Sequence, residues 1–407
     1  MTSNTPREVL VMCLADPSGN PRPRRAAEFC ASQGFNVSVM GYPPRKRLPV
    51  KTYYPLPFPL PGLLNKIIRR LWGVAVAVMP FERGRVFCEK KRFGLTRMKE
   101  AISGKRFDLL IVEDIQLLPL AFEVRGGGKI LFDAREYYPR QNEGVLWFDL
   151  FEKPRRVQLC RNYMTRCDAV ITVSEGLRLE YMKEFGIAAE VFRSTPPYVE
   201  LPVRPTNPEN IRLVYHGVAN RNRRLENLID VVSLLDNRFT LDLILTSDPK
   251  YQQELRRKAA GMDRIGFVEP VPFEDIIPTI GRYDIGFFYY EPTNFNLRHC
   301  LPNKLFEYIQ ARLMIAIGPS PDMAQLVKKY GCGVISKEFS VESMARVLNS
   351  LSAAEIAGLK RKSDLAAKEL CFEKESEKMA ALIERLLPEA VAARKTTELS
   401  EGYLQGE

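Results

Sequence analysis

The sequence predicts an α/β protein built from two Rossmann-like, doubly wound domains that face each other across a cleft. A chain of 407 residues can form two domains, each with its own core. Apolar runs of strand length alternate with helical patterns in the first half of the chain, and the alternation restarts after residue 210. Parallel strands need long crossover connections, so this alternation is typical of parallel sheets. Residues 194–210 contain five prolines and almost no periodicity, which indicates a linker between the halves.

The first half opens with a strand, a loop, a helix and a second strand. EVLVMCL (8–14) has the apolar pattern of a buried strand, and the helix predicted for residues 24–34 ends at Gly34 before a strand at 36–41. In such sheets, ligands bind beyond the carboxyl ends of the strands. Further strands of this half are predicted at 107–114, 129–136 and 169–176.

The second half repeats the pattern. From about residue 353 the chain reads as helical and highly charged, and residues 396–407 are expected to fray. The predicted strands of this half span 211–217, 239–247, 263–269, 283–290, 313–318 and 332–336. The predicted boundaries are a first domain at 1–197, a linker at 198–210, a second domain at 211–375, and a C-terminal helix and tail at 376–407.

Residues 54–94 depart from the alternation and form a predicted insertion. Their longest uncharged run, LWGVAVAVMPF, has 11 residues, whereas a membrane-spanning helix needs roughly 20. Apolar residues at helical spacing stand beside Lys66, Arg69, Arg70 and Trp72. Two interpretations remain open: an interfacial helix on an anionic membrane surface, or a helix that packs on the core and exposes a basic face.

The net charge of +11 indicates acidic partners such as phosphates or an anionic membrane. The basic residues form no single long tract, and no nucleic-acid-binding motif is present, so nucleic acid is not an expected partner. None of the eight cysteines forms a CxxC pair, and no Cys/His cluster has zinc spacing, so no metal site is expected. The N-terminus has no signal-peptide pattern, which favours a cytoplasmic protein, peripheral on the inner face of the plasma membrane if the insertion is interfacial.

Two segments of the second half predict a ligand site. After the strand that ends at Gly217, a polar loop carries Arg221, Arg223 and Arg224, and a helix is expected to begin near Arg223. Glycine allows close backbone approach and a helix N-terminus favours an anion, so this loop suits a phosphate. The alternative is a solvated basic turn.

The second segment is LPNKLFEYIQARLMIAIG (301–318), whose Pro-Asn start is consistent with a helix N-terminus. Lys304 and Glu307 share one face of this helix. A lysine near a helix N-terminus suits a phosphate, and a carboxylate one turn later suits vicinal sugar hydroxyls. The alternative is a surface ion pair of little energetic value. Ser320 and Asp322, further along, are predicted to be helix caps.

In the first half, charged residues gather where ligands would bind. Asp133, Arg135 and Glu136 end a predicted strand, and Asp16 and Arg22 lie in or after the first loop. They predict a second part of the site, with a capped strand end as the alternative. The only histidines of the chain are His216 and His299, both in loops of the second half.

Taken together, these segments resemble the GT-B glycosyltransferases of the retaining family 4. PNKLFEY followed by GPSPDMAQLVKKYGCGVIS, and YHGVANRNRRLENLI, resemble the donor-binding half of that family. FDLLIVEDIQLLPLAF, KILFDAREYYPRQ and CDAVITVSEGLRLEYMKEFG resemble its acceptor-binding half in the same order. The resemblance covers most of residues 8–375.

The resemblance implies roles for individual residues. Glu307 matches the glutamate that holds the donor ribose, while Lys304 and Arg223 match the cations that neutralise the diphosphate. Asp16 and Gly19 would border the diphosphate and the acceptor. The implied donor-binding set is Gly217, Arg223, Arg224, Asn303, Lys304, Leu305 and Glu307.

Two positions depart from the family pattern. His299 stands where the family often has a second glutamate, and Arg135 stands where it tends to have a histidine. An arginine can stabilise negative charge but cannot act as a neutral imidazole. The candidate catalytic residues are Arg135, Glu136 and His299.

The activity that the resemblance implies is hexosyl transfer from a nucleotide-diphosphate sugar to a hydroxyl of a glycan or lipid-linked acceptor. It would proceed with retention and without a metal, in polysaccharide or glycolipid synthesis of the bacterial type. Two alternatives remain open: a nucleotide-sugar 2-epimerase of the same architecture, and a non-catalytic binding member of the family. The epimerase would require histidines in the cleft, and none precedes His216.

Overall fold

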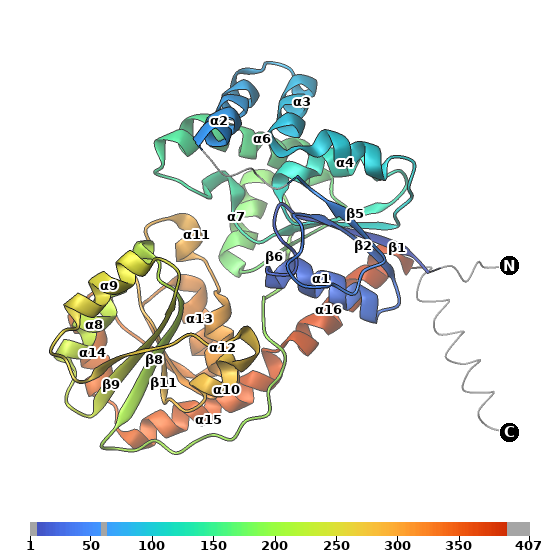
Figure 1. The fold of residues 1–407 in the computed structure, drawn as a ribbon. Coiled ribbons are helices and arrows are strands. Elements are labelled where there is room, and N and C mark those ends of the chain that lie inside the picture. Colours follow the sequence, from blue (N-terminus) through green and yellow to red (C-terminus); the bar gives the residue numbers. More distant parts are fainter. Residues whose placement is uncertain (1–5, 58–62, 389–407) are drawn as a thin grey trace, which may run out of the picture. The chain divides into compact units, whose positions relative to one another are not determined.

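The computed structural model describes residues 6–57 and 63–388. The chain divides into two compact units, which are described separately here. The first contains the described residues up to Val173, the segment Leu177–Phe192 and the described residues from Ser376 onward. The second contains Ser174–Gly176 and Arg193–Glu375. Each unit holds one parallel sheet with helices on both of its faces (Figure 1), which confirms the predicted α/β fold.

The sheet of the first unit has the strand order β3-β2-β1-β4-β5-β6-β7, and every pair is parallel. All five predicted strands are present. The sequence analysis missed two edge strands, β3 and β7, which have only four and two residues. The strands are β1 (Glu8–Met12), β2 (Asn36–Gly41), β3 (Thr52–Pro55), β4 (Leu109–Val112), β5 (Lys129–Ala134), β6 (Ala169–Thr172) and β7 (Glu190–Val191).

The first helix shows how local chemistry sets a boundary. It starts at Pro21, three residues earlier than predicted, because the Asn20 side chain accepts a hydrogen bond from the Arg22 N–H and proline suits the first helical turn. The predicted insertion forms two of the following helices, which pack against each other. The helices are α1 (Pro21–Ser32), α2 (Leu63–Val78), α3 (Glu82–Phe93), α4 (Leu95–Ile102), α5 (Leu118–Val124), α6 (Lys153–Asn162) and α7 (Glu175–Phe185).

The sheet of the second unit has the order β10-β9-β8-β11-β12-β13, again with parallel pairs. All six predicted strands are present and each lies within two residues of its predicted bounds. Their side chains form one continuous apolar core with the covering helices. The strands are β8 (Ile211–Val218), β9 (Phe239–Thr246), β10 (Ile265–Val268), β11 (Ile285–Phe288), β12 (Met314–Ile317) and β13 (Gly333–Ile335).

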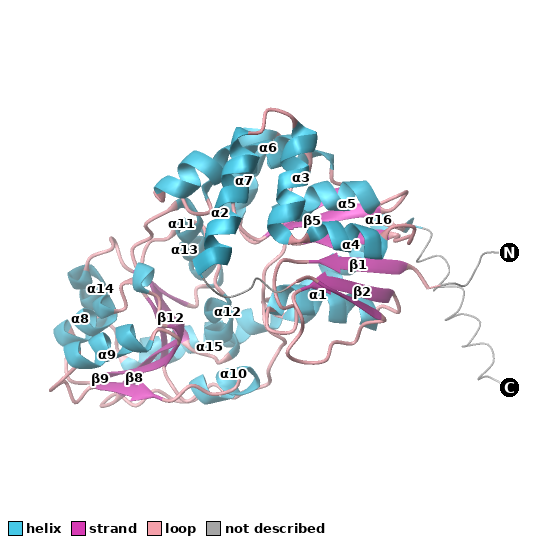
Figure 2. Cartoon of the chain, turned by 45° about the horizontal axis from the view of Figure 1, so that its top comes forward, coloured by secondary structure: helices cyan, strands magenta, loops and turns pink. Residues whose placement is uncertain are grey.

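Helices cover both faces of this second sheet, as Figure 2 shows. The helix after the arginine loop begins at Glu226 rather than near Arg223, because Arg221–Arg223 form a 3-10 turn first. The helices of this unit are α8 (Glu226–Leu234), α9 (Pro249–Lys258), α10 (Ile276–Ile280), α11 (Phe295–Arg298), α12 (Asn303–Gln310), α13 (Pro321–Tyr330), α14 (Val341–Asn349) and α15 (Ala353–Glu369). The last helix, α16 (Phe372–Leu386), belongs to the first unit from Ser376 onward.

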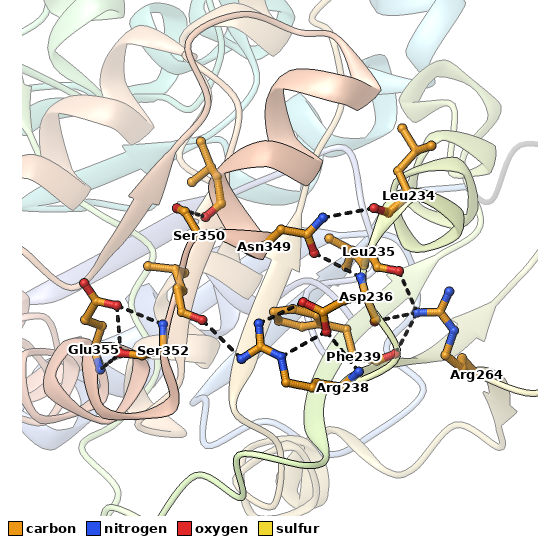
Figure 3. Close-up of polar contacts among 12 residues, drawn as sticks. Leu234, Leu235, Asp236, Arg238, Phe239, Arg264, Asn349, Ser350, Ser352 and Glu355 are labelled. Atoms are coloured by element: carbon orange, nitrogen blue, oxygen red, sulfur yellow. Dashed lines mark hydrogen bonds and ion pairs between the residues drawn. The ribbon is translucent and has the colours of Figure 1, made fainter.

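A polar network joins the ends of α8 and α14 in the second unit (Figure 3). The Asn349 side chain donates to the carbonyl of Leu234 at the end of α8 and accepts from the Asp236 N–H. Arg264 donates to the carbonyls of Leu235 and Asp236. Carbonyls at a helix C-terminus have no hydrogen-bond partner within the helix, so these bonds satisfy acceptors that would otherwise be unpaired.

Each sheet contains a point at which the strand order changes direction. In both sheets the first strand lies between the second and the fourth, because the chain adds strands first on one side of it and then on the other. The order of the strands therefore reverses beside the first strand. These reversals occur between β1 and β4 in the first unit and between β8 and β11 in the second. In doubly wound sheets, ligands bind at this topological switch point, beyond the carboxyl ends of the strands.

Candidate functional site

The switch point of the second unit is built around a buried lysine. Lys304, on the first turn of α12, is 7% exposed, and its Nζ lies 4.0 Å from the centre of the Tyr215 ring and 5.0 Å from that of Phe288. Gly217 at the end of β8 has a φ of 117°, and a Cβ there would stand 3.0 Å from Nζ. Glycine is therefore the residue that lets the lysine approach this strand.

Arg223 lies beside Lys304 at this switch point. Its Nη1 is 3.5 Å from the Tyr215 hydroxyl, and its guanidinium lies 5.4 Å from the centre of the Phe288 ring. Burial alone would raise the pKa of Tyr215, but the charges of Lys304 and Arg223 outweigh it and lower that pKa. Burial also lowers the pKa of Lys304 itself. Neither cation forms an ion pair within the described residues, and Lys304 Nζ and Arg223 Nε are buried there without a hydrogen-bond partner.

The other two arginines of this loop have different surroundings. Arg221 pairs with Glu254 at 2.6 Å and with Asp248 at 3.3 Å on the surface. Arg224 is exposed and adopts a left-handed conformation with φ of 45°. Of the three arginines, Arg223 is therefore the one that packs beside Lys304.

Glu307 lies one turn after Lys304 on the same helix and is 5% exposed. Its Oε2 stands 3.2 Å from Nε2 of His216. Burial, and secondarily the Lys304 charge, lower the pKa of His216 to about 3, so this imidazole is neutral at physiological pH. The burial of Lys304 and Glu307 excludes the surface ion pair considered above. Asn303 begins the helix, while the Leu305 side chain is buried in the core, so only the Leu305 backbone is available to a ligand.

His299 follows α11 and forms a close pair with Asp322. Its Nδ1 lies 2.7 Å from Oδ2 of Asp322, whose other oxygen accepts the Gly176 N–H at 2.9 Å. The prediction that Ser320 and Asp322 cap α13 holds only in position: Ser320 is the N-cap residue, but its side chain makes no capping bond. For Asp322 the prediction is wrong, because its carboxylate contacts His299 and Gly176 instead. Two residues on different helices had to be brought together for this pair to form.

The switch point of the first unit gathers charged side chains that neutralise one another. Arg22 donates to both carboxylate oxygens of Asp133, at 2.5 and 2.7 Å. Arg135 donates to Asp114 at 2.8 Å and lies 4.0 Å from Glu113. Arg135 therefore lies next to the carboxylates of Asp114 and Glu113. Such a guanidinium remains positively charged and is held in one orientation.

The loop after β1 is ordered by its own acid. The Asp16 carboxylate accepts from the N–H and the hydroxyl of Ser18, at 2.8 and 2.7 Å. Burial would raise the pKa of Asp16, but these bonds outweigh it and lower that pKa. Gly19 lies above this carboxylate, with ordinary van der Waals room for a Cβ. Burial raises the pKa of Glu136, the acid that follows Arg135.

Glu113 is a candidate residue that the sequence analysis missed. It directly follows β4, is 0% exposed, and neither carboxylate oxygen has a hydrogen bond within the described residues. Burial, with the nearby Asp133 charge, raises the pKa of Glu113 well above its usual range. The available signal was the Glu-Asp pair that ends the apolar run FDLLIVED, since charge at the carboxyl end of a buried strand points to the ligand edge.

The predicted interfacial segment forms α2. Lys66 and Arg70 are exposed, whereas Arg69 and Trp72 are half-buried. Arg69 and Arg70 lie over the rings of Phe93 and Trp147, at 5.7 and 5.4 Å. Four large apolar residues among the described side chains of this helix are exposed: Ile67 at 45%, Ile68 at 41%, Leu71 at 63% and Val78 at 69%. Within the described part of the chain, no helix has the length and apolar character needed to cross a membrane.

Metal ligands do not cluster in the described ranges: no group of three or more His, Cys, Asp or Glu residues is arranged to hold an ion.

No protein-family model matches the chain, and no curated protein matches its sequence.

Solved structures do match the fold. The glycosyltransferase WaaG, described as involved in lipopolysaccharide biosynthesis, aligns with a TM-score of 0.62 and 14% identity over 92% of this chain and 99% of its own. Sucrose-phosphate synthase from Thermosynechococcus elongatus gives 0.68 and 12% over 94% and 99%. HepE from Anabaena, solved with UDP and glucose, gives 0.61 and 12% over 93% and 100%. At such identities the likeness shows the fold alone, which is that of the GT-B glycosyltransferases.

Proposed function

We propose that this protein is a glycosyltransferase that moves a hexose from a nucleotide-diphosphate sugar to a hydroxyl of an acceptor. One observation carries the proposal: Lys304 and Arg223 meet at the switch point of the second sheet without a carboxylate partner among the described residues. Two cations without an ion pair, beside the N-terminus of α12, suit a diphosphate. UDP in the HepE structure belongs to a protein of the same fold, which supports a nucleotide-sugar donor.

The chemical problem in such a transfer is the leaving diphosphate, which gains negative charge in the transition state. Lys304, Arg223 and the first N–H groups of α12 are the groups available to stabilise that charge. Glu307, whose carboxylate lies beside the neutral imidazole of His216, would accept hydrogen bonds from the ribose hydroxyls. Gly217 and the backbone of Asn303 and Leu305 complete the proposed donor site. Retention of configuration and independence from metal ions are part of the proposal.

The proposed acceptor site lies at the switch point of the first sheet. Asp16, Gly19, Arg135 and Glu136 border it, and their charges are mostly compensated within the protein. Such a site suits a hydroxylated acceptor bound through hydrogen bonds, which a glycan or a lipid-linked glycan provides. The proposed setting is therefore polysaccharide or glycolipid synthesis in the cytoplasm.

A lipid-linked acceptor would require contact with the inner face of the plasma membrane. The exposed apolar residues of α2 beside Lys66, Arg69 and Arg70 support an interfacial role. Reversal of these three charges to glutamate should release the protein from anionic liposomes in co-sedimentation. Undiminished binding would reject the interfacial role. Tryptophan fluorescence of the wild type, which arises from Trp72 and Trp147, should also respond to the vesicles.

A donor panel tests the activity. The protein is titrated with UDP-, GDP- and dTDP-sugars, and slow hydrolysis of each is followed. We expect one nucleotide to bind, and Lys304→Ala, Arg223→Ala and Glu307→Ala to weaken that binding. Arg221→Ala is the matched control, because Arg221 belongs to the same loop but pairs with Glu254 on the surface.

The panel also separates the alternatives. Binding with epimerisation of the sugar, and no transfer or hydrolysis, would establish the 2-epimerase. Absence of binding to every donor would rule out both enzymes and leave a non-catalytic binding protein.

A further inference from the structure

A hollow of about 890 Å³ lies at the carboxyl ends of the last two strands of the second sheet, β12 and β13. The helix α13 forms one wall, because Pro321, Ala324 and Lys328 follow one another at helical spacing on one face. The opposite wall is the segment after β13, which contributes Ser336 and Lys337. The hollow therefore opens at the edge of the sheet where doubly wound proteins bind ligands.

The lining of this hollow carries three cations. Lys328 and Lys329 belong to the last turn of α13, and Lys337 comes from the segment after β13. All three residues are exposed, and none forms an ion pair within the described part of the chain. Among the described residues that line the hollow, none is an Asp or Glu. Like charges that share one hollow repel each other, and an anion between them removes that repulsion.

Helix geometry alone accounts for part of this pattern. Cations in the last turn of a helix interact favourably with its free carbonyls, which explains Lys328 and Lys329 without a ligand. It does not explain Lys337, which lies outside the helix. A last-turn lysine elsewhere in the same unit has a carboxylate partner: Lys258 of α9 lies 2.6 Å from Asp230. The lysines of the hollow have no such partner in the described residues.

The rest of the lining indicates the size and chemistry of a ligand. Pro319, Ala324 and Ile335 provide an apolar surface, while Gln325 and Ser336 provide polar groups. The volume of about 890 Å³ is much larger than a single ion needs and falls within the range of small-molecule sites, roughly 300–1,000 Å³. Lysine ammonium groups bind phosphate as point charges. Together these features suit a phosphate carried on a larger body.

We propose that this hollow binds a phosphomonoester through Lys328, Lys329 and Lys337. The ester has two sources, a free sugar phosphate and a phosphorylated lipid headgroup, because both present the same group to the lysines. The inference goes beyond the proposed function, since none of these lysines belongs to the donor or acceptor residues named above.

Calorimetric titration of the full-length protein with glucose 1-phosphate tests the free sugar phosphate. Lys304→Met is the background, because the proposed diphosphate site also suits a phosphate. In that background, the double substitution Lys328→Gln and Lys337→Gln should weaken binding about tenfold or more, since two charge-assisted contacts are lost.

Two further variants separate the charge from the fold. Lys328→Arg with Lys337→Arg keeps both charges and should retain binding, with an affinity that falls as salt screens the exposed cations. Lys250→Gln, at an exposed lysine of the same unit, is the matched control and should leave the affinity unchanged.

Vesicles of phosphatidylcholine and phosphatidic acid test the lipid headgroup. The protein in this arm carries Lys66→Glu, Arg69→Glu and Arg70→Glu, so that α2 does not contribute to vesicle binding. Co-sedimentation that is lost in the double glutamine variant would identify the headgroup as the ligand.

The proposal is overturned if neither source binds, if the double glutamine variant binds as tightly as its background, or if Lys250→Gln weakens binding equally. Binding of a phosphomonoester here, together with a failed donor panel, would reject the proposed function alone. Nucleotide-sugar binding without any phosphomonoester binding would reject only this inference.

Discussion

The carboxyl ends of the two sheets carry their charges in opposite arrangements. At the first sheet the cations have carboxylate partners: Arg22 bonds Asp133 through two nitrogens, and Arg135 bonds Asp114. Taking charges out of water is costly, and here each buried cation is compensated within the protein. The positive charges of Arg22 and Arg135 are therefore balanced by carboxylates of the protein itself, without a ligand.

At the second sheet the cations face aromatic rings. Lys304 lies over Tyr215, and Arg223 lies over Phe288, and neither forms an ion pair within the part of the chain that the structure describes. Cation–π contact returns only part of the lost hydration energy. The difference between the two ends is therefore that the second holds buried cations without an ion pair, at a cost to the stability of the folded protein, and these are the cations of the proposed diphosphate site.

The largest expected effect comes from removing one of these cations. Lys304→Met should weaken nucleotide diphosphate binding about 100-fold, because a charge-assisted hydrogen bond to phosphate is lost. The same substitution should raise the free energy of unfolding by about 1–2 kcal/mol, since an uncompensated buried charge is replaced by an apolar side chain of similar length. Calorimetric titration measures the first effect and urea unfolding the second.

Lys250→Met, at an exposed lysine of the same unit, is the control and should change neither quantity. A Lys304→Met protein that is less stable than the wild type would show that the lysine is compensated after all. The contrast between the two sheets would then be wrong.

The opposite result is expected at the first sheet. Arg22→Met should lower the free energy of unfolding by about 3–5 kcal/mol, because Asp133, 5% exposed, would be left buried without its partner. Glu28→Gln is the control on the same helix: the Glu28 side chain is 47% exposed and lies 3.8 Å from Arg24, and exposed ion pairs contribute about 0–1 kcal/mol. Thermal unfolding of the two variants side by side would reveal the difference, and equal losses would refute it.

How far the sequence predicts this molecule depends on the range of the contacts involved. The strands of both sheets were predictable because long apolar runs such as FTLDLILTS leave few other solutions. The missed β3 contains TYYP, a short run ending in proline, which is tolerated only because the strand lies at the sheet edge. Residues 52–55 form a strand because they pair with β2, and this pairing is not visible in their own sequence.

The site shows the same limit more strongly. Lys304 and Glu307 could be found because they stand in one short segment, but their burial depends on β8 and on the space at Gly217. Asp322 was mistaken for a cap, since a carboxylate near a helix start usually acts in that way. Its pairing with His299, 23 residues earlier, becomes visible only after α11 and α13 are folded onto the sheet.

The smallest expected effect concerns Glu113, the buried acid at the first sheet whose carboxylate has no hydrogen bond among the described residues. The test asks whether Glu113 is protonated in the folded protein, and so contributes no negative charge to balance the arginines there. Burial and the Asp133 charge hold the pKa of Glu113 well above its usual range, so the folded protein binds its proton more tightly than the unfolded chain does. The stability that this proton contributes is present below the unfolded pKa, about 4.3, and is lost as pH rises toward the folded pKa.

Glu113→Gln cannot lose a proton and escapes that decline. Its unfolding free energy should match the wild type near pH 4 and then exceed it, by up to about 1.4 kcal/mol for each pH unit in that window. Urea unfolding between pH 4 and 8 measures the difference, with Glu200→Gln at an exposed position as the flat control. A Glu113→Gln protein that is less stable at pH 8 would mean that Glu113 is ionised and compensates Arg135. The first sheet would then have no exception to its internal pairing.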